Sequence, residues 1–227
     1  MVQSTIAYAL AARAHGRDGR VLSTPDTVER MRSAAASFGE ASRGALAGPT
    51  GLAGDGTLVV LLASPDGVLP AARVIAASVR PARTTFCAAR SEFPTSASSR
   101  EAVEPAILVS DRALSVAAER IEETDFRQAR FLVVGPSPGE LVGTLIGLIL
   151  ESYDSMTDRQ TQIVELLRES ETQQQVATHL GVSRQAVNQS LTAAGWPHIE
   201  RAEKIARREL AALWNRQEGE KSRGGER

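Results

Sequence analysis

Seven polar side chains between residues 172 and 189 are of the types that bind DNA. Arginine suits guanine, and asparagine or glutamine suits adenine, because each can form two hydrogen bonds to the base edge. From residue 172 to residue 199 there is no Asp or Glu, so no carboxylate would repel the phosphates. We therefore predict double-stranded DNA as a partner and these residues as its binding site: Thr172, Gln173, Ser183, Arg184, Gln185, Asn188 and Gln189.

The elements that would position these side chains are three short helices between residues 157 and 195. Thr172 and Gln175 have the spacing of a capping box, in which two side chains satisfy the free N–H groups of a helix start. Gly181 can take the left-handed conformation that ends a helix. Ser183 then caps the third helix. This is a helix-turn-helix, whose second helix lies in the DNA major groove.

A purely structural reading is a small helical bundle with polar outer faces, since helix-turn-helix patterns give false positives. Ala177 is small where two crossing helices approach, and Gly181 follows at the tight turn. Val182, Val187 and Leu191 recur at helical spacing and can pack inward. Because these features agree with the caps and with the acid-free face, we favour DNA binding.

The composition shows that any affinity for DNA must come from a local patch of the surface and not from the overall charge of the chain. The chain has 227 residues, a formal net charge of −1 and a pI of about 6.3, so no overall basic footprint attracts nucleic acid. One helix-turn-helix with one or two arginines binds weakly, and paired half-sites add affinity. We therefore expect a homodimer.

No constellation of residues predicts catalysis or a bound metal. The single cysteine, Cys87, excludes an intrachain disulfide and a cysteine-cluster metal site. The three histidines have no metal-ligand spacing, and there is no P-loop lysine and no nucleophile motif. We predict no catalytic residue, no metal ligand and no cofactor. No secretory signal is visible, and the most apolar run, 141–150, is too short to span a bilayer, so we expect a cytoplasmic protein without a membrane partner.

The N-terminal part predicts an α+β fold. Apolar runs and turn residues indicate strands and helices in the order β-α-β-β-α-β, followed by a further helix and strand. This order is typical of a ferredoxin-like split βαβ fold with additions, in which helices cover one face of an antiparallel sheet. The expected elements are a strand at 5–12, a helix from residue 25, a hairpin at 51–64, a helix at 69–79, a strand at 84–90, a helix at 105–123 and a strand at 130–135.

Four segments follow from this pattern. Residues 1–138 form a ferredoxin-like sensor or dimerisation domain, 139–155 a connecting helix, 156–214 an all-α helix-turn-helix domain with a C-terminal helix, and 215–227 a disordered tail.

The element order, the Gly54-Asp55-Gly56 turn and the terminal helix-turn-helix together resemble the SatD family. The strongest part is the segment MTDRQTQIVELLRESETQQQVATHLGVSRQAVNQSL, and weaker parts are Glu104-Pro105-Ala106 and Asp111-Arg112-Ala113-Leu114. The resemblance implies a domain like those of nucleotide cyclases or GGDEF proteins, fused to a DNA-binding region. It also implies a nucleotide or small-molecule effector.

That resemblance raises the alternative of a metal-dependent enzyme that binds or converts nucleotides. Cyclase-type catalysis uses two carboxylates to hold metal at the triphosphate, one on the first strand and one at the hairpin. Asp55 could be the second, but residues 6–12 contain no carboxylate. Asp-Gly is also a common tight hairpin turn. We therefore expect no enzyme, but a transcription regulator whose cyclase-like domain is catalytically degenerate.

Overall fold

The computed structural model describes residues 4–42, 44–48, 50–52, 56–94, 119–121, 128–135, 138–169 and 172–224. Its sheet has five strands in the order β2-β3-β1-β4-β5. They are β1 Ser4–His15, β2 Gly51–Leu52, β3 Leu58–Leu62, β4 Arg83–Pro94 and β5 Phe131–Val133. Long β1 lies between β3 and β4 and is antiparallel to both, whereas β5 runs parallel to β4.

The α+β class is therefore confirmed, but the ferredoxin-like antiparallel sheet is not. β5 joins in parallel, so the sheet is mixed. A parallel neighbour requires a connection that crosses from one end of the sheet to the other, which strand patterns alone do not indicate.

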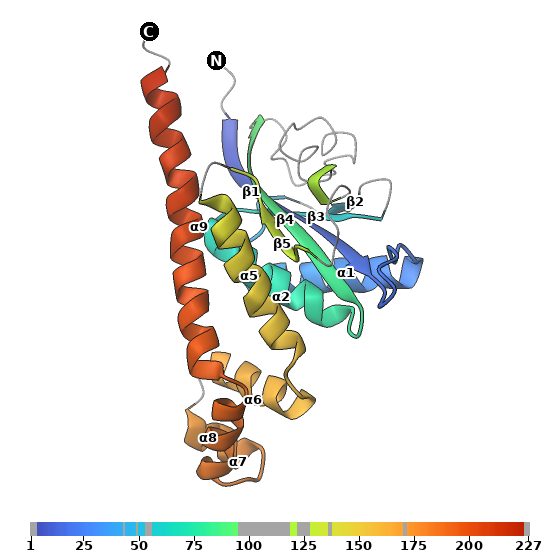
Figure 1. The fold of residues 1–227 in the computed structure, drawn as a ribbon, viewed down its shortest axis with the longest axis vertical. Helices are drawn as coiled ribbons and strands as arrows, with labels where there is room; N and C mark the ends of the chain where they lie inside the picture. Colours follow the sequence, from blue (N-terminus) through green and yellow to red (C-terminus); the bar gives the residue numbers. More distant parts are fainter. Residues whose placement is uncertain are drawn as a thin grey trace.

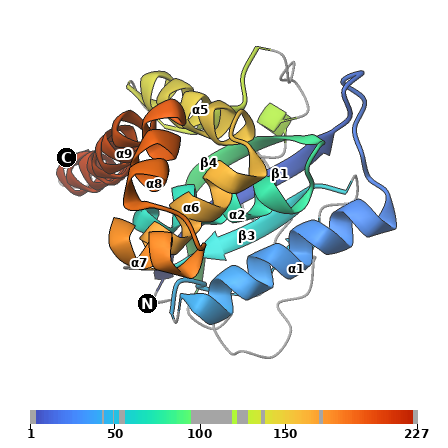
Figure 2. The ribbon, with the colours of Figure 1, turned by 90° about the horizontal axis from the view of Figure 1, so that it is seen from below.

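Alternation along β1 gives the sheet two different buried faces. Leu10 and Ala12 point toward the main core, whereas Ala9 and Ala11 point to the opposite side, the latter beside Cys87. Helices that pack on the first face include α1 Pro25–Ala41, α2 Val68–Ser78 and α5 Gly139–Asp154, with the 3-10 turn η1 Pro65–Gly67 leading into α2 (Figures 1 and 2).

Glycines bring α5 unusually close to the sheet. A Cβ atom at Gly143 would lie 2.7 Å from the carbonyl oxygen of Phe131 in β5, and one at Gly147 would be 3.6 Å from the Cβ of Arg130. Real Cβ atoms do not approach a backbone oxygen that closely, so only glycine allows this packing at residue 143.

The C-terminal region is all helical, as expected. It comprises α6 Asp158–Arg168, α7 Gln173–His179, α8 Arg184–Ala193 and the long α9 Trp196–Gly224. In Figure 1 the first three lie below the sheet, at the C-terminal end of α5, while α9 runs back up beside α5. Its fully buried Trp214 packs on Tyr8 of β1, with ring centroids 4.9 Å apart.

Residues 215–224 continue α9, where the sequence predicts the start of a disordered tail. Extending a helix costs far less than starting one, so polar residues can follow an anchored turn. The boundaries of the predicted domains are otherwise not tested. Asp55 and most of the predicted helix 105–123 lie outside the described residues, and residues 119–121 are helical.

Candidate DNA-binding site

Each helix of the motif begins at a side-chain cap, at Thr172 and Ser183 as predicted and also at Thr157. The Thr157 and Thr172 hydroxyls accept hydrogen bonds from the N–H groups of Gln160 and Gln175, whose side chains accept in return from the threonine N–H groups. The Ser183 hydroxyl accepts from the Ala186 N–H at 3.1 Å. Because a capping hydroxyl still has its own proton, Thr172 and Ser183 can also donate to a phosphate.

The turn between α7 and α8 depends on one glycine. Gly181 has a φ of +64°, and the N–H of Val182 donates to the carbonyl of Ala177. Ala177 is buried, as predicted, and lets the two helices cross closely. The expectation that Val182 packs inward is wrong, since its side chain is exposed. It lies just after the turn and before the cap, so the helical spacing that begins at α8 does not apply to it.

The predicted base-reading residues share one open face. Val187 and Leu191 are buried and hold α8 to the core. Arg184, Gln185, Asn188 and Gln189 are exposed, as are Thr172 and Ser183, while Gln173 is half-buried. Between residues 172 and 199 this surface contains no carboxylate. Such a face can enter a major groove without desolvating a buried charge or opposing a phosphate.

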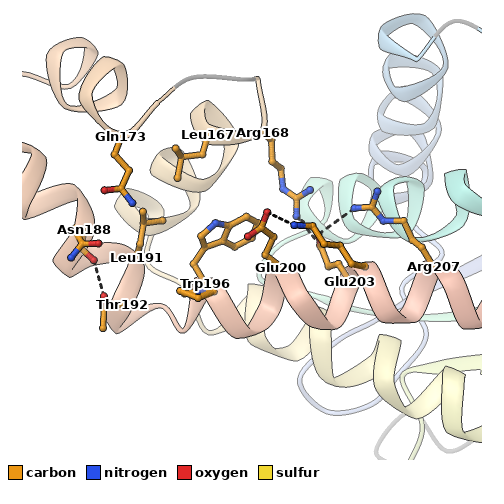
Figure 3. A pocket seen from close by; sticks show the side chains of 12 residues that line it. Leu167, Arg168, Gln173, Asn188, Leu191, Thr192, Trp196, Glu200, Glu203 and Arg207 are labelled. Carbon is orange, nitrogen blue, oxygen red and sulfur yellow. Dashed lines mark hydrogen bonds and ion pairs between the residues drawn. The ribbon is translucent and has the colours of Figure 1, made fainter.

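A groove of about 560 Å³ runs from this face to α9. Figure 3 shows Gln173 and Asn188 at one end, Trp196 in the middle, and Arg168 and Arg207 at the other end. Two predicted DNA-binding residues therefore line one hollow with cationic side chains of α6 and α9.

The floor of that groove is a buried ionic cluster around Glu203 of α9. Arg168 donates to both Glu203 carboxylate oxygens at 2.7 Å, and the Tyr153 hydroxyl donates to Oε1 at 2.8 Å. Arg207 contacts the same carboxylate at 3.4 Å. The guanidinium of Arg168 also lies 5.0 Å from the ring centre of Trp196. These contacts join α5, α6 and α9 at the base of the motif.

Burial controls the ionisation of this cluster. Removal from water raises the pKa of the Tyr153 hydroxyl, and the Glu203 charge raises it further, so the phenol keeps its proton as a donor. Burial alone would lower the pKa of Arg168, but its hydrogen bond and charge interaction with Glu203 outweigh that effect and raise it. At physiological pH the Tyr153 phenol therefore keeps its proton and the Arg168 guanidinium keeps its charge.

One ion pair connects the motif to the sheet domain, and a hydrogen bond connects the end of α5 to it. Arg73 of α2 pairs with Glu165 of α6, and its guanidinium lies 5.8 Å from the ring centre of Tyr153. Arg80 donates to the Tyr153 carbonyl at 2.6 Å. The helix-turn-helix is thus packed against the N-terminal part.

The sequence pattern of α9 does not reveal this arrangement. Glu203 is 2% exposed and Arg207 half-buried, although both belong to a charged stretch that resembles a solvated helix face. The available indication was the four-residue spacing of Glu203 and Arg207, which places them on one side of a helix. Arg168 lies at the end of a different helix, so its contact depends on tertiary packing.

Comparison with known families agrees with this geometry. Residues 154–194 match the family described as Sigma-70, region 4, a helix-turn-helix region that binds DNA. The match covers α6, α7 and α8, so this stretch is similar to a DNA-binding module of transcription proteins.

Outside that stretch no family match is found. No SatD or nucleotide-cyclase family matches it, so the resemblance is supported only for the helix-turn-helix. No curated protein and no solved structure matches the chain. Among the described residues, no group of three or more His, Cys, Asp or Glu side chains could hold a metal ion. In the same part of the chain, every helix is too short or too polar to cross a membrane.

Proposed function

We propose that this protein is a homodimeric, sequence-specific transcription regulator that binds double-stranded DNA through α8. The observation that carries the proposal is the exposed, carboxylate-free face of α8, held by capped helices in a region similar to Sigma-70, region 4. Arg184 and Gln185 lie in its first turn, which is where a recognition helix contacts base edges.

The proposal extends to the N-terminal domain. Its role would be to dimerise and to bind a nucleotide or small-molecule effector without converting it, in the cytoplasm. In support, the part of β1 where a cyclase-like enzyme needs a carboxylate is occupied by Ala9, Leu10, Ala11 and Ala12, all fully buried. The same proposal includes that this N-terminal domain is SatD-like and catalytically degenerate.

The first experiment is capture of genomic DNA fragments by the purified full-length protein at a stated salt concentration, because phosphate contacts make affinity salt-dependent. A recurring sequence in the captured fragments then serves as the probe in gel shifts. Capture without any recurring sequence would contradict sequence-specific recognition.

The second experiment tests the recognition helix. In Arg184→Ala the loss of a base contact of about 1–3 kcal/mol should weaken binding to the captured sequence by roughly 5- to 150-fold. Binding to unrelated DNA should change much less. Arg20→Ala is the matched control, because Arg20 is an exposed arginine in the loop after β1, remote in sequence from α8. Equal specificity of the Arg184→Ala and Arg20→Ala proteins would remove α8 as the reading element.

A further inference from the structure

Two leucines on α5 are the most exposed large apolar side chains of the described residues. Leu141 is 70% exposed and Leu148 61%. They are seven residues apart on one helix, with exposed Thr144 between them, so they form a single stripe along α5. The rest of α5 is engaged, because Val142, Ile146, Ile149 and Leu150 are buried in the core. We define Leu141, Thr144 and Leu148 as the α5 stripe.

We propose that the α5 stripe is the surface on which a second copy of this chain docks, with the two α5 helices side by side and parallel. A seven-residue spacing is the repeat by which two equal helices meet along a common seam. In a parallel pair about a two-fold axis, Leu141 would meet Leu141 of the second copy and Leu148 would meet Leu148.

The surface beside the α5 stripe contains grooves that can accept side chains of a partner helix. A groove of about 160 Å³ lined by Thr144, Gly147 and Leu148 lies against β5, and a larger one of about 620 Å³ is lined by Gly139, Glu140 and Thr144. Side chains of a second α5 can therefore enter hollows instead of meeting a flat surface.

Charge also permits two equal copies to meet there. Glu151 lies at the C-terminal end of the stripe, and a parallel pair would bring two such carboxylates together. Each is already paired within its own copy, with Arg83 and with Arg130. The Glu151 charges are thus neutralised before the copies associate, and the three residues of the α5 stripe are uncharged.

The direction of the pair rests on the proposed function. α5 leads directly into α6, and the helix-turn-helix lies at the C-terminal end of α5 (Figure 1). Two parallel α5 helices would present both α8 helices at the same end of the dimer, where one DNA duplex can contact both. An antiparallel pair would place them at opposite ends.

Sedimentation of the full-length protein without DNA tests the surface. We expect a dimer for the natural chain and a rise of about 100-fold or more in its dissociation constant for Leu141→Glu/Leu148→Glu, because charges at the centre of an interface disrupt it. Leu52→Glu is the matched control, since Leu52 is 41% exposed at the opposite edge of the sheet. A monomeric natural chain, or a double variant as dimeric as the control, would overturn the proposal. If the stripe binds a different protein and not a second copy, the purified chain should be monomeric, which is the first of these outcomes.

Oxidative cross-linking of conservative variants tests the direction and does not depend on a disruptive charge. In a parallel pair Leu148→Cys should link to itself, and so should Leu141→Cys. In an antiparallel pair neither variant would cross-link by itself, whereas a mixture of Leu141→Cys and Leu148→Cys proteins would. Cross-linking in the mixture alone would overturn the parallel arrangement. The natural thiol should not interfere, because Cys87 is fully buried and burial raises its pKa to about 12.

The two proposals can fail separately. A monomeric natural chain that still binds a recurring DNA sequence through Arg184 would remove the α5 stripe and keep DNA recognition. A dimer that depends on Leu141 and Leu148, but captures no recurring sequence, would keep the docking surface and remove the regulator.

Discussion

The ion pair between Glu203 and Arg168 gives the sharpest test of how the helix-turn-helix is held. Glu203→Leu removes a carboxylate that is 2% exposed and receives three hydrogen bonds of 2.7 to 2.8 Å, two from Arg168 and one from Tyr153. Breaking a buried pair costs about 3–5 kcal/mol, because the remaining charge stays buried without a partner. Arg168 is 21% exposed, so water relieves part of this cost and we expect about 3 kcal/mol.

The assay is thermal unfolding followed by circular dichroism, at equal protein concentration. For a chain of this size a loss of 3 kcal/mol lowers the midpoint by roughly 6–12 °C. Glu200→Leu is the control, because Glu200 is half-exposed and pairs with Lys204 on its own helix. An exposed pair of that kind contributes at most about 0.5 kcal/mol.

A double variant separates a buried charge from a general loss of packing. In Glu203→Leu/Arg168→Met both charges are removed, so the protein should recover much of the stability that Glu203→Leu alone loses. If Glu203→Leu shifts the midpoint no more than Glu200→Leu, or if the double variant is worse than the sum of its parts, the cluster does not hold the motif in the way described.

Three further predictions concern stability and its dependence on pH. Gly143→Ala should destabilise the protein by about 1–3 kcal/mol in urea unfolding, since its Cβ would press on the Phe131 carbonyl, and an unchanged midpoint would contradict the close contact. Gly181→Ala should cost about 1–2 kcal/mol because of its φ of +64°, while Gly181→Asn should cost less; equal losses would argue against the left-handed turn. Burial lowers the pKa of His15, so below about pH 6.5 the unfolded chain takes up a proton that the folded chain does not. The free energy of unfolding should therefore fall as the pH decreases. Urea unfolding at several pH values should show a smaller dependence on pH for His15→Gln.

The local chemistry of the chain predicts the helix-turn-helix well. Caps at Thr157, Thr172 and Ser183 depend on side chains and N–H groups within three residues, so their formation follows from spacing alone. The same is true of the left-handed glycine at 181. These short-range features place the exposed face of α8 without knowledge of the rest of the fold.

Long-range features are not predictable in that way. The sequence shows β5 as an apolar run, but its parallel pairing with β4 depends on the path of the connection between them. The sequence likewise shows Glu203 as one charge among many on a helix. Its burial results from Tyr153 and Arg168, which come from two other helices. Residues far apart in the chain decide both outcomes, and periodicity carries no information about them.

The length of α9 has a mechanical consequence. Its Trp196 lies at the helix-turn-helix and its Trp214 against β1, eighteen residues or about 27 Å further along a continuous helix. Because α9 is continuous between these two contacts, each inserted or deleted residue would rotate Trp196 by about 100° around the helix axis relative to Trp214. The orientation of α8 relative to the sheet therefore depends on the number of residues between Trp196 and Trp214, and only insertions or deletions close to a whole number of helical turns would preserve it.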